Sequence, residues 1–281
     1  MHHALSGLLG LSRLTHIVDI GANPIDGAQP YSPMLTAGYC RLTGFEPQSK
    51  EHARLVAQAG PTERYFPLAI GDGSPATLRI CAYSGWSSLL EPDPRMLALF
   101  PHFAKAAQVI DRVQLETVRL DAIADLGDFD MLKIDVQGSE LTIFRSSAEL
   151  LRDVVCIQTE VSYLSLYQGQ PAQGEVDMAL RELGFIPHCF AGSKMSWIAP
   201  IPEFADPAGH INQLLEADLV YVRDFTDPAG LSDEQLKHLC LLVHHLYGSY
   251  DLAGHCMAQL VGRGSIEPSA LAEYLDFVRS H

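Results

Sequence analysis

Ile17-Val18-Asp19-Ile20-Gly21-Ala22-Asn23 is an apolar, β-branched run that ends abruptly in an acid, a glycine and an asparagine. This pattern is typical of a buried parallel strand followed by a tight turn, where Gly21 lets the backbone change direction. Open α/β sheets bind nucleotides at the carboxyl ends of their strands. We therefore expect a ligand to lie beside this turn.

The composition indicates a globular protein with an acidic surface. The chain has 281 residues, 47% of them hydrophobic, and can bury the core of one generous domain or of one domain with an appendage. Its formal net charge is -15, from 34 acids against 19 bases. Phosphate binding needs clustered Lys and Arg, so this charge argues against nucleic acid or an anionic membrane as a partner.

Targeting and redox signals are weak. No apolar run approaches the roughly 18 residues that cross a bilayer, and the first residues carry no Lys or Arg before a short apolar segment. We therefore expect a cytoplasmic protein. The six cysteines form no Cys-x-x-Cys pair, so we expect free, buried thiols rather than disulfides or a zinc site.

Strand-like and helix-like segments alternate along most of the chain. We expect helices near residues 30–40, 49–59, 141–151 and 176–183, and strands near 41–46, 65–70, 154–160, 185–190 and 219–224. Residues 76–81 resemble one arm of a hairpin, and 163–174 form a polar and aromatic candidate lid. A capping box begins at Ser232 and opens a run of helical segments at 232–246, 252–261 and 268–278.

Three motifs stand out, namely Asp19-Ile20-Gly21-Ala22-Asn23, Phe45-Glu46-Pro47 and Leu132-Lys133-Ile134-Asp135-Val136-Gln137-Gly138-Ser139-Glu140. Together they resemble the FkbM family of S-adenosylmethionine-dependent methyltransferases. Two departures stand out, since Ile25 replaces a usual glycine and Gln137 replaces a usual glutamate. The first suggests a longer loop over Pro24 to Asp26. The resemblance covers roughly residues 14 to 225.

The resemblance implies an α/β, Rossmann-like methyltransferase fold. Its sheet would have seven mostly parallel strands and an antiparallel last strand. We expect the methyltransferase domain to span residues 1–228 and a helical C-terminal extension, with dimerisation as one option, to span 229–281. The implied cofactor is S-adenosyl-L-methionine.

Several positions would bind that cofactor. The first motif contributes Asp19, Gly21, Ala22 and Asn23, and the family's third strand places Ile70 and Gly71 near the adenine. Glu46, followed by Pro47, lies a little over twenty residues beyond Gly21, where nucleotide-binding α/β units place a ribose-binding carboxylate. Ser88 belongs to a Gly-x-Ser-Ser-Leu loop like the family's. Asp72 either contacts the adenine or only forms a turn. The plainer alternatives for the other two residues are that Glu46 is a solvated loop residue and that Ser88 caps a turn.

Asp135 and Glu160 are the candidate catalytic residues, because each follows a strand predicted to end at the same edge of the sheet. Asp135 is also expected to bind the cofactor. His188 and His210 are weaker candidates for a general base, and Asp121 is expected to be a helix N-cap. Glu140 could join Asp135 and Glu160 around Mg²⁺, or it could pair locally on its helix. Because the acids have no spacing that is diagnostic of a metal site, we predict none.

The resemblance implies O-methylation of a hydroxylated small molecule, either a glycan or another natural product. N-methylation and a cofactor-binding scaffold without catalysis remain open. A nicotinamide oxidoreductase is the nearest α/β rival. It is disfavoured because the chain lacks Gly-x-Gly-x-x-Gly and a Tyr-x-x-x-Lys pair at Tyr163 or Tyr167.

Overall fold

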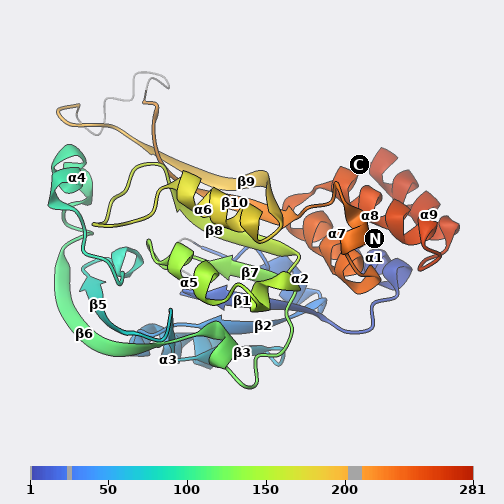
Figure 1. Ribbon diagram of the computed structural model, residues 1–281, viewed down its shortest axis with the longest axis horizontal. Helices are drawn as coiled ribbons and strands as arrows, with labels where there is room; N and C mark the ends of the chain where they lie inside the picture. The colour runs from blue at the N-terminus through green and yellow to red at the C-terminus, as the bar shows by residue number, and fades with distance from the viewer. Residues whose placement is uncertain (1, 24–26, 202–210, 281) are drawn as a thin grey trace.

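A seven-stranded sheet forms the centre of the computed structural model, which describes residues 2–23, 27–201 and 211–280 (Figure 1). The strand order is β3-β2-β1-β7-β8-β10-β9. The bounds are β1 (Thr15–Ile20), β2 (Cys40–Phe45), β3 (Glu63–Phe66), β7 (Met131–Ile134), β8 (Cys156–Ser162), β9 (Phe185–Ser196) and β10 (Gln213–Arg223).

The topology confirms the predicted fold class. The strands β3, β2, β1, β7 and β8 are parallel, and the last strand, β10, is inserted antiparallel between β8 and β9. All six residues of β1 are buried. Because Ile20 pairs with Phe45 on one side and with Ile134 on the other, three strands end at the same level. Their carboxyl ends therefore form one common rim.

The third strand differs from the expected 65–70. It ends at Phe66, and after Pro67 and Leu68 the chain enters a separate short strand, β4 (Ala69–Ile70). Pro67 has no N–H group for the ladder, which explains the break. Strand β4 belongs to a second, three-stranded sheet with β5 (Pro75–Cys81) and β6 (Val109–Val118).

The predicted arm at 76–81 is confirmed as part of β5, which pairs antiparallel with β6. No strand was predicted for the first part of β6. Its first four residues, Val109-Ile110-Asp111-Arg112, do not alternate between apolar and polar, so they lack the pattern that marks a half-buried strand.

Helices cover one face of the main sheet. They are α5 (Glu140–Ser146) and α6 (Gln173–Glu182), which share a hydrophobic cluster with alternate strand residues such as Val18, Leu132 and Ile157. Shorter or more peripheral helices are α2 (Ser32–Thr36), α3 (Ser49–Gln58) and α4 (Pro94–Leu99).

The helix N-cap predicted at Asp121 is wrong. Residues 120–122 form a single 3-10 turn whose N-cap position is Arg119, without a side-chain cap. The Asp121 carboxylate instead accepts two hydrogen bonds from the Arg119 guanidinium, at 2.9 and 2.5 Å. With only one helical turn to cap, the local ion pair is the better partner for this exposed carboxylate.

The opposite face of the sheet is covered by the C-terminal helices. These are α7 (Asp233–Tyr247), α8 (Tyr250–Gly262) and α9 (Pro268–Arg279), and they lie beside the N-terminal helix α1 (His2–Leu9) at one end of the molecule (Figure 1). The capping box is confirmed, because Ser232 Oγ accepts from Gln235 N and Gln235 Oε1 accepts from Ser232 N.

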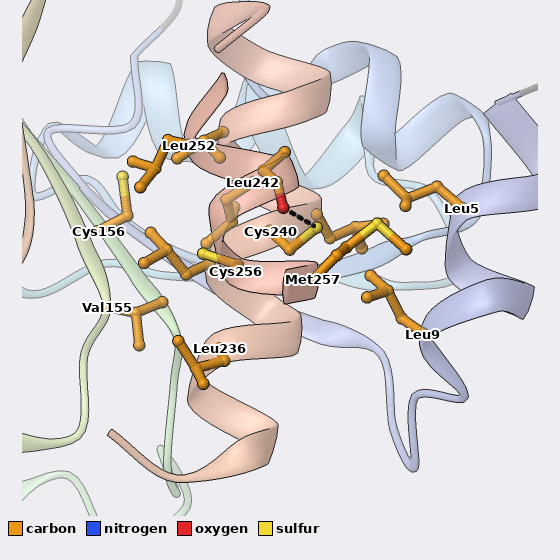
Figure 2. Packing of buried hydrophobic residues seen from close by; sticks show 14 of the residues in the cluster. Leu5, Leu9, Val155, Cys156, Leu236, Cys240, Leu242, Leu252, Cys256 and Met257 are labelled. Atoms are coloured by element: carbon orange, nitrogen blue, oxygen red, sulfur yellow. Dashed lines mark hydrogen bonds between the residues drawn. The ribbon is translucent and has the colours of Figure 1, made fainter. Parts of the chain in front are cut away.

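These helices share one core with the sheet. Leu236, Leu242 and Met257 belong to the same cluster of buried residues as Val155 and Cys156 of the sheet (Figure 2). The six cysteines are free, as predicted, and all but the half-buried Cys189 are buried. The domain boundary at residue 228 stays a prediction. None of the helices in the described parts of the chain is long and apolar enough to cross a bilayer.

Candidate active site

A cavity of about 1050 Å³ opens at the carboxyl ends of β1, β2 and β7. One part of its wall is formed by Gly21, Asn23 and Glu46, and another by Asp135 and Gln137. The wall continues over the loop that holds Trp86 and Ser88, then over β9 and β10, to Tyr247 at the end of α7. The cavity therefore joins the predicted cofactor motifs to segments far from them in sequence.

The turn after β1 has room for no side chain. Gly21 has φ +80°, and a Cβ atom built on it would lie 2.0 Å from the backbone oxygen of Asp135. The N–H groups of Gly21 and Ala22 both donate to Phe45 O, at 3.0 and 3.1 Å. The turn thus brings the ends of β1, β2 and β7 into direct contact, which only glycine permits.

Asp19 lies beneath this turn and does not line the cavity. Its Oδ2 atom accepts from Tyr31 Oη at 2.5 Å, and its Oδ1 atom lies 3.4 Å from Lys133 Nζ. Burial raises the pKa of Asp19, although Lys133 and Tyr31 act in the opposite direction. Asp19 therefore contacts Lys133, a buried cation on the neighbouring strand, and this ion pair supports the cavity wall from behind.

Asn23 lines the cavity and carries an unpaired, buried donor. The side chain is 9% exposed, and its Nδ2 atom has no hydrogen-bond partner among the described residues. Buried amide groups are rarely left without a partner, so this donor fits an anionic or carbonyl group of a ligand. The longer loop expected at Pro24 to Asp26 lies outside the described residues, but the following Gly27 lines the cavity.

Glu46 is a buried carboxylate on the cavity wall, next to Pro47. The residue is 3% exposed, and its Oε1 atom accepts from Gln48 N at 2.8 Å. Burial raises the pKa of Glu46 to about 7. The alternative of a solvated loop residue is therefore excluded.

The remaining predicted cofactor residues differ in their positions. Ile70 lines the cavity, whereas Ala22 and Gly71 do not. Ser88 lines it too, but its hydroxyl donates to Gln137 O at 2.7 Å and accepts from Leu90 N at 2.9 Å. Asp72 accepts from Ser74 N at 2.9 Å, which is the turn role.

The two candidate catalytic acids are brought together by a third side chain. Gln137 Nε2 donates to Asp135 Oδ1 at 2.8 Å and to Glu160 Oε2 at 2.7 Å. Only Asp135 of the two acids lines the cavity. Glu160 is 6% exposed, lies 3.4 Å from Lys194 Nζ, and has a pKa raised well above its ordinary value by burial and by the charges of Asp135 and Glu216.

The weaker base candidates lie elsewhere. His188 Nε2 pairs with Ser249 Oγ at 2.7 Å, so its ring contacts the C-terminal helices and does not line the cavity. Its assignment as a base is wrong, since β9 turns this side chain to the face covered by those helices. His210 lies outside the described residues.

Glu140 makes the local interaction that the sequence analysis considered. Its carboxylate accepts from the N–H groups of Val136 and Gly138 at 3.0 to 3.2 Å, and burial raises the pKa of Glu140 to about 7. Within residues 2–23, 27–201 and 211–280, no group of three His, Cys, Asp or Glu side chains has metal-binding geometry.

Two tyrosines near the site were not predicted from the sequence, and of these only Tyr247 lines the cavity. Tyr167 is buried and donates to Gln137 Oε1 at 2.9 Å, so part of the candidate lid supports the acid pair. Tyr247 lines the cavity and donates to Gln158 Oε1 at 3.1 Å, which places the end of α7 at the site. Neither tyrosine belongs to a motif, and only the tertiary packing reveals its position.

Comparison with known proteins supports the sequence resemblance. The family model "Methyltransferase FkbM domain" matches residues 19–187, which is more than half of the chain. The chain is 30% identical over 172 residues to "2-O-methyltransferase NoeI" from Sinorhizobium fredii (strain NBRC 101917 / NGR234), covering 58% of this chain and 70% of that protein.

Similar solved structures are more distant. The magnesium protoporphyrin IX methyltransferase from Synechocystis PCC 6803, with bound SAM, is 11% identical over 79% of both chains, with a TM-score of 0.38. A putative methyltransferase from Thermoplasma acidophilum is 10% identical over 76% of this chain and 70% of the other, also with a TM-score of 0.38. On the strength of the family model and the curated relative, the chain belongs to the FkbM methyltransferases, whose methyl donor is S-adenosylmethionine.

Proposed function

We propose that the protein is an O-methyltransferase that acts on a hydroxyl group of a small molecule, such as a sugar or a related natural product. The observation that carries this proposal is the Asp135 carboxylate on the cavity wall, held by Gln137 beside the cofactor motifs. The Sinorhizobium fredii relative is named a 2-O-methyltransferase, which agrees with oxygen as the acceptor atom.

The cofactor end of the cavity fits S-adenosylmethionine. Gly21 lines the cavity at the turn that joins the three strand ends, and the unpaired Asn23 Nδ2 can donate to the carboxylate of the methionine part. Glu46 can accept from the ribose hydroxyls. When bound, the cofactor supplies a methyl group on a positively charged sulfur.

Asp135 would take the proton from the acceptor hydroxyl. A general base within hydrogen-bond reach contributes roughly a hundred- to ten-thousand-fold, and the alignment of donor and acceptor contributes more. Glu160 lies behind this wall, close to Lys194, so we assign it the support of Asp135 rather than contact with the acceptor. The sequence predicted that both acids are catalytic, whereas here we propose that Asp135 alone contacts the acceptor.

The acceptor end of the cavity suits a hydroxylated molecule. Lys194, Asp218 and Tyr247 contribute polar groups, and Trp86 and Trp197 contribute aromatic ones. Most of these residues follow residue 187, where the match to the family model ends. We therefore propose that this later part of the chain determines which acceptor is methylated.

Two measurements, made one after the other, test the proposed function. The first is calorimetric titration of the protein with S-adenosylhomocysteine, with NAD as the control, and we expect binding of the former alone. The second is incubation with S-adenosylmethionine and matched panels of monosaccharides and amines, followed by mass spectrometry. Addition of one methyl group at a sugar hydroxyl is the expected result.

Other outcomes would redirect the proposal. Methylation only within the amine panel would indicate an N-methyltransferase. Tight cofactor binding without transfer to either panel would favour a scaffold that has lost catalysis. A preference for NAD would contradict the cofactor assignment itself.

A further inference from the structure

Gln137 is held in an unfavourable backbone conformation. Its φ is +57°, and it is the only residue other than glycine with a positive φ among the described residues. Non-glycine residues rarely adopt this region, and they keep it only where surrounding contacts compensate. Gln137 is also the position at which an amide replaces the acid typical of the motif.

Its side chain accounts for the conformation. Both N–H bonds of the amide are used, one toward Asp135 Oδ1 and one toward Glu160 Oε2, at 2.8 and 2.7 Å. The amide oxygen accepts from Tyr167 Oη at 2.9 Å. Rotating the amide by 180° would turn its oxygen toward two carboxylates, so the network admits one orientation. The main-chain oxygen of Gln137 accepts from Ser88 Oγ at 2.7 Å.

An acid at this position could not make the same contacts. An ionised carboxylate has no hydrogen-bond donor, whereas one amide nitrogen serves two acceptors at once. Asp135 and Glu160 are each within hydrogen-bond distance of this nitrogen, so their bound oxygens are at most about 5.5 Å apart, the sum of the two distances. The amide keeps two like charges close together by giving each an N–H group.

The acid pair lies among many titratable groups. From the elements packed around it these are Asp19, Lys133, Glu140, Tyr167, Lys194, Glu216 and Asp218. Lys194 Nζ is shared, at 2.8 Å from Glu216 Oε1 and 3.4 Å from Glu160 Oε1. Glu160 therefore has one oxygen near a cation and the other on the amide, while Asp135 has its Oδ1 on the amide.

We propose that Gln137 is a positioning residue, which binds Oδ1 of Asp135 and Oε2 of Glu160 and thereby leaves Oδ2 of Asp135 to receive the proton of the acceptor hydroxyl. This inference rests on the proposed function, in which Asp135 is the base. Tyr167 completes the arrangement by fixing the amide. We call Gln137, the two acids that it binds and Tyr167 the clamp. Neither Gln137 nor Tyr167 needs to touch the cofactor.

The test compares Gln137→Leu, which removes both N–H groups at similar size, with Gln137→Glu, which replaces them by a third carboxylate. Gln170→Leu is the matched control, because Gln170 is also a buried amide and the change adds no charge, but Gln170 bonds to Ser162 and to backbone N–H groups instead of acids. If Gln137→Leu does not fold, Gln137→Asn is the substitute, since its amide is one methylene too short to bridge both acids.

The first readout needs no acceptor. The carboxyl carbon of Glu160 is followed by ¹³C NMR over a pH titration, with and without S-adenosylhomocysteine. Loss of a donated hydrogen bond disfavours the ionised form, so we expect the midpoint to rise by about 1 pH unit in both Gln137 variants and to stay unchanged in Gln170→Leu. An unchanged midpoint in the Gln137 variants would overturn the inference.

The second readout separates positioning from binding. Using the acceptor that the sugar panel identifies, we expect turnover of Gln137→Leu to fall at least about 100-fold, and the acidic limb of its pH–rate profile to move. The affinity for S-adenosylhomocysteine should stay within about 3-fold of the unsubstituted protein. Wild-type turnover with an unchanged pH profile would refute the clamp.

Failure of the proposed function would look different. If the unsubstituted protein did not bind S-adenosylhomocysteine, the cofactor assignment would be contradicted. The titration of Glu160 in the free protein would still support or overturn the contact between Gln137 and the acid pair.

Discussion

Cofactor affinity should depend on pH through Glu46. Burial raises the pKa of Glu46 to about 7 in the free protein, and ribose hydroxyls donate best to the ionised carboxylate. With that pKa, roughly ten-elevenths of Glu46 is ionised at pH 8 and roughly one-eleventh at pH 6. The affinity for S-adenosylhomocysteine should therefore fall about 10-fold between pH 8 and pH 6.

The Glu46→Gln variant isolates this effect. Hydrogen bonds to a charged group contribute about 1.5 to 3 kcal/mol, so at pH 8 the variant should bind about 10- to 100-fold more weakly. Its affinity should then be the same at pH 6 and pH 8, because the amide does not titrate. Isothermal titration calorimetry at pH 6, 7 and 8 measures both effects.

Glu140→Gln is the matched control. The pKa of Glu140 is also raised to about 7 by burial, but its carboxylate binds backbone N–H groups and does not line the cavity. This variant should keep the 10-fold pH dependence of the unsubstituted protein. Equal affinity of the unsubstituted protein at pH 6 and pH 8, or a persistent pH dependence in Glu46→Gln, would refute the role of Glu46.

Three further predictions concern stability and turnover. The raised pKa of Glu46 stabilises the fold below pH 4.5, and this contribution is lost as the pH rises through 7. Without cofactor, the unfolding free energy of Glu46→Gln at pH 8 should therefore exceed that of the unsubstituted protein by up to about 3 kcal/mol, with a higher unfolding temperature, and the two proteins should unfold at the same temperature near pH 4.5. Gly21→Ala should lose at least about 2 kcal/mol in urea unfolding and all S-adenosylhomocysteine binding. Gly38→Ala, with φ +73° but no atom within 4 Å of the added Cβ, should lose about 1 kcal/mol; equal losses would contradict the steric argument. Asp135→Asn should lower turnover about 100- to 10,000-fold and leave calorimetric cofactor affinity within about 3-fold, and full turnover would remove Asp135 as the base.

The sequence predicted the parts of the site that depend on local pattern. A buried strand followed by Gly21 or Asp135 has a recognisable run of apolar residues, and parallel pairing brings the ends of such strands together. Glu46 was found by the same logic, from its distance along the chain to Gly21. These residues line the cavity because strand length and direction suffice to place them.

Long-range pairing determined what the sequence could not show. Glu160 was expected at the end of a strand, but β8 continues to Ser162 because Ser162 pairs with Glu216 of β10. Glu160 is therefore inside the sheet, opposite Asp218, and reaches the site only through Gln137. In the same way, the position of His188 depends on the helices that cover β9, which are distant in sequence.

The insertion of β10 between β8 and β9 affects how the protein can be made. Within the described parts of the chain, strand β9 has β10 as its only strand neighbour, although β9 is synthesised first. Until residue 223 has left the ribosome, the outer edge of β8 stays unpaired and β9 has no place in the sheet. Unpaired edges promote association between chains, so the last strand closes a vulnerable interval in biosynthesis. An expression fragment that stops at residue 187, where the family match ends, would remain permanently in that vulnerable state.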